Sequence, residues 1–106
     1  MSKGRFESPC ARSVVERVVT YTALEFGIEW QNILTETRGA PDCSSARVLA
    51  MAVCCAAGVP PFLVARLFCR SWSTVDEARK NTLAKCRGNE ADRDRFIRIL
   101  YRGIGR

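Results

Sequence analysis

The chain has 106 residues, 47% of them hydrophobic and 26% charged, which suits a single globular domain with one hydrophobic core. It contains no histidine, the commonest general base, and its six cysteines include no Cys-x-x-Cys pair. We therefore expect neither an enzyme nor a metal centre nor a cofactor. The net charge of +6 favours a polyanionic partner.

The positions of the charged and apolar residues narrow the class of protein. Residues 1–65 hold six basic and six acidic side chains, whereas residues 66–106 hold eleven basic and five acidic ones. The longest apolar run, Val48–Val64, is interrupted by one glycine and two prolines, and no apolar signal segment follows the amino terminus. We expect a cytoplasmic protein with reduced cysteines and no membrane contact, associated with the nucleoid if it binds DNA.

The spacing of apolar residues and helix breakers predicts an all-α fold of about six helices. We expect residues 1–12 to be a flexible segment and residues 13–106 to form the helical domain. Ser13 and Glu16 make a capping box that predicts the start of the first helix, and Gly27 predicts its end. A short helix over residues 29–34 should follow, with three residues packing inward: Trp30, Ile33 and Leu34.

The next predicted helix lies at the centre of the fold. After a loop over residues 37–41, a cap within residues 42–45 should start a helix that reaches Ala57 and is apolar on nearly every side. Gly58 should end it, and the proline pair at 60 and 61 suits the first turn of another helix. That helix should point four side chains inward: Leu63, Val64, Leu67 and Phe68.

The last two predicted helices carry most of the basic residues. Cys69 and Arg70 make a turn, and Ser71 is a good amino-terminal cap for a helix over residues 72–86. Its predicted inward side chains are Val75, Ala78, Thr82 and Cys86, and its outward ones are Ser73, Glu77, Lys80 and Ala84. A final helix over residues 91–101 should pack Phe96, Ile99 and Leu100 inward and display Arg93, Arg95, Arg98 and Arg102.

Residues 60–86 thus form a helix, a short turn and a longer helix, the arrangement of a helix-turn-helix motif. In that motif the amino end of the second helix enters the major groove, where hydroxyls and arginines contact phosphates or base edges. The same arrangement also occurs in small helical domains as an ordinary change of chain direction, without DNA binding. Trp72 likewise has two interpretations: its ring packs on Phe68 or Phe62, or it contacts DNA.

Three segments resemble the C-terminal DNA-binding domain of the bacterial replication initiator DnaA. They are Phe26-Gly27-Ile28, the stretch 45–52, and Ala65-Arg66-Leu67-Phe68 followed by the block 70–75. The resemblance spans most of the chain, from about residue 14 to residue 100. It implies a helical domain with a Trp-repressor-like helix-turn-helix that binds double-stranded DNA, here without the nucleotide-binding portion of an initiator.

The resemblance also implies which residues contact DNA. Arg70 falls on the arginine of the family signature, and Ser73 and Thr74 fall on its threonine pair. Ser71 and Trp72 stand where the family has an aspartate and a histidine. We expect DNA contacts from Arg47, Arg70, Ser71, Trp72, Ser73, Thr74 and Lys80, with further phosphate contacts from Arg38, Arg79 and Lys85.

Two other functions compete with a DNA-binding regulator of replication or transcription. The first is a module that keeps the helix-turn-helix fold but binds a protein partner in replication or transcription, through Trp72 and the acidic pair Asp76 and Glu77. The second is a thiol-based redox switch at Cys69. The sequence does not predict the oligomeric state.

Overall fold

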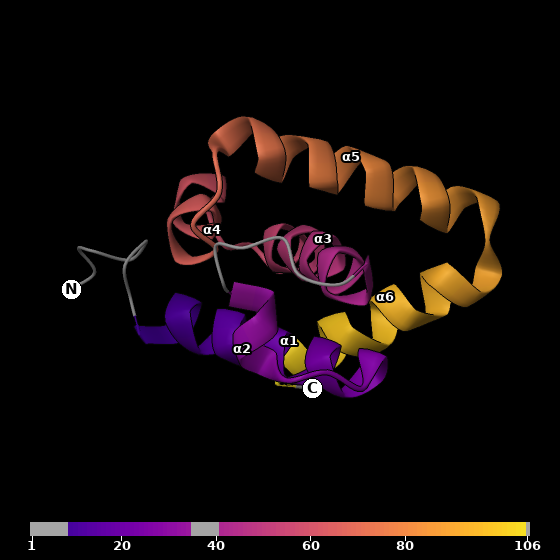
Figure 1. Ribbon diagram of the computed structural model, residues 1–106, viewed down its shortest axis with the longest axis horizontal. Helices are drawn as coiled ribbons and strands as arrows, with labels where there is room; N and C mark the ends of the chain where they lie inside the picture. The colour runs from indigo at the N-terminus through magenta and orange to yellow at the C-terminus, as the bar shows by residue number, and fades with distance from the viewer. Residues whose placement is uncertain (1–8, 35–40, 106) are drawn as a thin grey trace.

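The computed structural model describes residues 9–34 and 41–105, and within these ranges it is helical with no strand. The helices, coloured in chain order in Figure 1, are α1 (Pro9–Phe26), α2 (Trp30–Leu34), α3 (Pro41–Ala56), α4 (Pro61–Leu67), α5 (Trp72–Gly88) and α6 (Glu90–Gly103). The prediction of an all-α fold of about six helices is confirmed. None of these helices combines the length and apolarity needed to cross a membrane.

Helix α3 lies at the centre, as its apolar sequence predicts. It packs against each of the other five helices and appears in the middle of Figure 1. Its buried positions are Cys43, Ala46, Arg47 and the run from Ala50 to Cys54. Alanines make up much of this surface, and their small side chains let neighbouring helices approach closely on several sides.

Helices α1 and α6 pack side by side in opposite directions. In the middle of α1, Arg17 Nε donates a hydrogen bond of 2.8 Å to the carbonyl of Gly103, and near the end of α1 Glu25 pairs with Arg98. Gly103 is required by contact rather than by backbone angle, because a Cβ there would lie 2.5 Å from the Val18 side chain. The contacts between α1 and α6 hold α6 against the core.

Two helix starts differ from the prediction. Helix α1 begins at Pro9, so Ser13 lies inside it, and the capping-box prediction is wrong. Residues 9–12, expected in a flexible segment, are helical; the rest of that segment lies outside the described residues. Helix α3 includes residues 42–45, which were expected to form its cap. Proline fits the first turn of a helix because that turn needs no donor from its nitrogen, so both helices begin at a proline.

Trp30 is half-exposed, which contradicts its predicted inward packing, whereas Ile33 in the same helix is fully buried. Its indole borders a groove of about 450 Å³ over Val15 and Val19 of α1. In the five-residue helix α2, Ile33 is the buried residue and Leu34 is half-buried, so the helix reaches the core near its end and Trp30 lies at the edge of the contact with α1 and α3.

The connection from α3 to α4 follows the prediction. Gly58 has a φ of +100°, which suits glycine, and Val59 N donates to the Cys54 carbonyl at 3.1 Å, ending α3. Pro60 is the cap of α4 and Pro61 its first residue. Leu63, Val64 and Phe68 are buried and Leu67 is half-buried, which anchors α4 in the core.

Candidate nucleic-acid interface

Helices α4 and α5 meet at a corner on the edge of the molecule (Figure 1). Helix α4 ends because Cys69 N donates to the Arg66 carbonyl and Arg70 N donates to the Ala65 carbonyl, at 3.2 and 2.9 Å. Cys69 has a φ of +56°, a left-handed backbone conformation that costs residues other than glycine about 1 kcal/mol. This turn sets the direction in which α5 leaves the corner.

Ser71 caps α5 as predicted. Its hydroxyl accepts a hydrogen bond from Thr74 N at 3.2 Å, and its Oγ lies 2.9 Å from Thr74 Oγ1. Both hydroxyls are exposed, and each retains capacity for a further hydrogen bond. The cap therefore holds two of the predicted contact residues, Ser71 and Thr74, in one fixed arrangement at the tip of α5.

The first turn of α5 is exposed to solvent. Ser73 and Thr74 are exposed, and Trp72 is 59% exposed, so its ring is not covered with only the N-H left exposed, as one of its two interpretations expected. Phe68, one of its two expected partners, is fully buried in the core, and Phe62, the other, is 47% exposed. The indole is thus available at the tip next to two hydroxyl side chains.

Arg70 is half-buried and turns back on the corner. Its Nη1 donates to the carbonyls of Phe68 and Cys69, at 3.3 and 3.0 Å. A cation is favourable at these carbonyls because they lie at the negative carboxyl end of α4. Arg70 therefore lies beside the tip of α5 as predicted, with part of its donor capacity used within the protein.

Arg47 does not belong to the interface, which corrects its predicted role in DNA contact. The residue is 4% exposed. Its Nε donates to the Ile33 carbonyl at 2.8 Å and its Nη2 donates to the Asn32 carbonyl at 2.9 Å. Burial lowers the pKa of Arg47, and the charge of Arg70 lowers that pKa further. The guanidinium joins α3 to the last turn of α2, and a duplex cannot reach it.

One carboxylate on α5 engages two predicted phosphate contacts. Asp76 accepts from Arg79 at 2.7 Å and pairs with Lys80 at 3.2 Å. The hydrogen bond from Arg79 is the main reason that the pKa of Asp76 lies below its ordinary value, and the hydrogen bond from Lys80 is the second. The spacing of i, i+3 and i, i+4 permits these pairs, so the sequence contained the signal.

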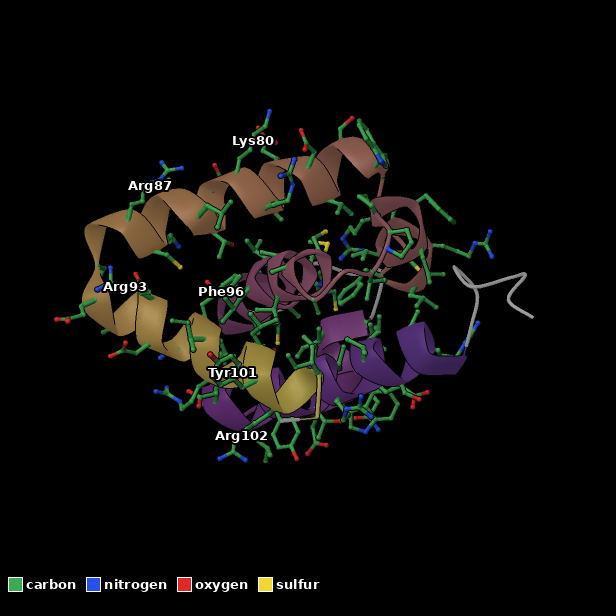
Figure 2. The ribbon with its side chains drawn as sticks, turned by 180° about the vertical axis from the view of Figure 1, so that it is seen from behind. Lys80, Arg87, Arg93, Phe96, Tyr101 and Arg102 are labelled. Carbon is green, nitrogen blue, oxygen red and sulfur yellow. The ribbon has the colours of Figure 1, made fainter. Side chains whose placement is uncertain are left out.

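The remaining predicted phosphate contacts lie elsewhere. Lys85 is exposed and borders a groove of about 670 Å³ between α3, α5 and α6, but it is turned by about 140° around α5 from Lys80. We therefore place it outside the interface and revise its expected phosphate contact. Arg38 lies outside the described residues. Arg87, which is not among the predicted DNA contacts, is exposed on the same outer side of α5 as Lys80, and both side chains point away from the body in Figure 2.

The arginines of α6 mostly bind α1 and α5. Arg98 makes two hydrogen bonds with the Glu25 carboxylate, at 2.9 and 3.0 Å, and Arg95 lies 3.6 Å from the same group. The Arg98 hydrogen bond is the main cause that lowers the pKa of Glu25. Arg102 lies over the Tyr21 ring, and Arg93 donates to the Cys86 carbonyl at 3.3 Å.

The cysteines that the structure describes are free thiols. Burial raises the pKa of Cys54, and Cys69 is the exposed one, at the corner between α4 and α5. Among the described residues no group of three or more acidic or cysteine side chains is placed to hold a metal ion.

Comparisons of the chain with protein families, with curated proteins and with solved structures found no match. The functional interpretation therefore rests on the corner formed by α4 and α5. That corner combines a capped helix start, an uncovered first turn and basic side chains farther along α5.

Proposed function

We propose that this protein is a non-enzymatic DNA-binding protein that uses the α4–α5 corner as a helix-turn-helix and regulates replication or transcription. The observation that carries the proposal is the uncovered amino end of α5, where Trp72, Ser73 and Thr74 are all exposed. This end of a helix carries the positive end of the macrodipole and suits the approach of phosphates. In helix-turn-helix proteins the same end enters the major groove.

The dimensions of α5 suit a major groove. The helix has 17 residues, and its buried side chains Val75, Ala78, Thr82 and Cys86 share one face, which leaves the opposite face open along its length. A major groove about 12 Å wide admits an α-helix. Helix α5 can therefore enter the groove by its tip while α4 remains packed on the core.

Each exposed side chain at the tip has a defined part in this proposal. The hydroxyls of Ser73 and Thr74 hydrogen-bond to phosphates or base edges, and the Trp72 indole offers an apolar surface to a thymine methyl or a sugar. Arg79 and Lys80 exchange Asp76 for phosphate oxygens as the duplex binds. With about three to four phosphates neutralised, log affinity should fall with log salt at a slope of about −2.7 to −3.6.

Fluorescence anisotropy with labelled duplexes of random sequence, at low and moderate salt, tests the proposal. Ser73→Glu places a negative charge at the tip and should weaken binding about tenfold or more. Gln31→Glu adds the same charge on α2, away from α5, and should change affinity less than about twofold. Absence of binding by the unaltered protein at tens of micromolar and low salt would overturn the proposal.

A second candidate function is supported by the exposed aromatic side chains at the same corner. Phe62 of α4 is 47% exposed and Trp72 is 59% exposed. Such side chains anchor protein interfaces, and Asp76 and Glu77 beside them would repel phosphates. Under this alternative the unaltered protein has no affinity for DNA, and the double variant Arg70→Ala, Lys80→Ala still captures a protein partner from replication or transcription.

A further inference from the structure

We infer that duplex DNA contacts the whole outward side of α5. In this arrangement Arg87, near the carboxyl end of α5, binds a phosphate in addition to Lys80. The inference rests on the proposed DNA binding and extends it from the tip of α5 to the full helix. It assigns a contact role to a residue that neither the sequence pattern nor the family resemblance indicates.

The outward side of α5 forms one continuous line of side chains, here called the outer ridge. Its members follow one another at intervals of four and three residues, which places them on one side of a helix. All are exposed, and they lie opposite the buried stripe of α5: Ser73, Glu77, Lys80, Ala84 and Arg87. At about 1.5 Å per residue the ridge is about 21 Å long, or about six base-pair steps.

The sizes of the ridge side chains suit a groove. Ser73 and Ala84 are small, so the backbone of α5 can approach the floor of the groove at two points along the ridge. Glu77, between them, would repel phosphates on the walls, but at the floor it can accept a hydrogen bond from a cytosine amino group. Lys80 and Arg87 are long and carry charge at their ends, which reach the phosphates on the walls. Figure 2 shows both of these side chains leaving the outer side of α5 and pointing away from the body.

The charge on the ridge is least compensated at Arg87. Lys80 shares Asp76 with Arg79, at 3.2 and 2.7 Å, whereas Arg87 makes no ion pair or side-chain hydrogen bond with the residues that the structure describes. The carboxyl end of a helix repels phosphates, but here Arg93 donates to the Cys86 carbonyl and offsets part of that negative end. Arg87 therefore presents an uncompensated cation to the duplex.

Lys85 provides a matched control because it is also exposed and lies only two residues earlier in the same helix. It borders the groove that Ser45 of α3 and Asp92 of α6 also line, as does its neighbour Ala84, but it is turned by about 200° around the helix from Arg87. That position is on the flank of α5, turned from the outer ridge by the helical rotation between the two residues. A duplex bound on the outer ridge should therefore contact Arg87 and not Lys85.

The test compares Arg87→Ala with Lys85→Ala by anisotropy on one 20-base-pair duplex over a range of salt concentrations. Alanine favours helix at both positions, and circular dichroism checks that both variants fold. Arg87→Ala should weaken binding about five- to tenfold at moderate salt and reduce the slope of log affinity against log salt by about 0.9. Lys85→Ala should change the affinity less than twofold and leave the slope unaltered, while Arg87→Lys should retain most of the slope.

The outcomes separate this inference from the proposed function. One outcome is that the unaltered protein binds duplex DNA while Arg87→Ala and Lys85→Ala lower its affinity equally, or while neither lowers it. In either case the ridge is not the docking surface and the proposed function still stands. If the unaltered protein does not bind duplex DNA at low salt, the proposed function fails and this inference fails with it.

Discussion

Arg47 of α3 donates to the main-chain carbonyl of Ile33 in α2 at 2.8 Å, inside the fold and away from any surface a duplex can reach. The same guanidinium donates to the Asn32 carbonyl. The carboxyl end of a short helix leaves carbonyls without partners, and a buried cation satisfies them while the carbonyls compensate its charge. Arg47 is therefore an anchor for α2.

Replacing this anchor should lower stability without changing DNA affinity. Arg47→Ala removes at least two hydrogen bonds from a charged donor and leaves a buried and a partly buried carbonyl without these donors, so the free energy of unfolding should fall by about 2–4 kcal/mol in urea denaturation. Arg66→Ala, at an exposed position of α4, should change it by less than about 0.5 kcal/mol. Weaker DNA binding by Arg47→Ala at a temperature where it remains folded would contradict the anchor role.

The cap of α5 should be measurable as stability. Ser71→Ala removes the acceptor of the Thr74 amide and should lower the free energy of unfolding by about 1 kcal/mol, as judged by urea or thermal denaturation. Ser71→Asp supplies another acceptor and should retain most of that stability. Equal losses in the two variants would show that the hydroxyl does not act as the cap.

Asp76 should restrain DNA binding, because it holds two cations that phosphates would otherwise attract. Asp76→Asn keeps the size of the side chain and removes its charge, so DNA affinity should rise about three- to tenfold at low salt, with a steeper salt dependence. Asp94→Asn, an equal change of charge at an exposed position of α6, is the control for net charge. Equal gains from both variants would mean that the long-range field, rather than the release of Arg79 and Lys80, sets the affinity.

Stability should fall in acid through Glu25. The folded state holds the pKa of Glu25 below its ordinary value, chiefly because Arg98 donates to the carboxylate. The stabilisation is present above the unfolded pKa of about 4.3 and disappears as the pH falls through the lower, folded pKa. Urea midpoints measured from pH 6 to pH 3 should fall, and Glu25→Gln should show a smaller decrease. Glu29→Gln should behave like the unaltered protein; the same acid dependence in Glu25→Gln would contradict the prediction.

Local patterns in the sequence determined most of the helices. The buried stripe Val75, Ala78, Thr82 and Cys86, the cap at Ser71, and the stop at Gly58 all follow from spacing and residue type, because helix periodicity and capping act over a few neighbouring residues. The predicted starts of α1 and α3 were wrong. In each helix a proline and a capping residue a few positions later could both begin the helix, and local residue preferences do not decide between these two starts.

Only the tertiary structure decided which basic side chains are available to a partner. The sequence gives Arg47, Arg87 and Arg98 the same charge, yet the first is buried against α2, the second is exposed on α5, and the third is paired with Glu25 of α1. A side chain's availability depends on which carbonyls and carboxylates the packed helices bring within about 4 Å of it. Glu25 and Arg98 are far apart in the sequence, so only the packing of α1 on α6 brings them together.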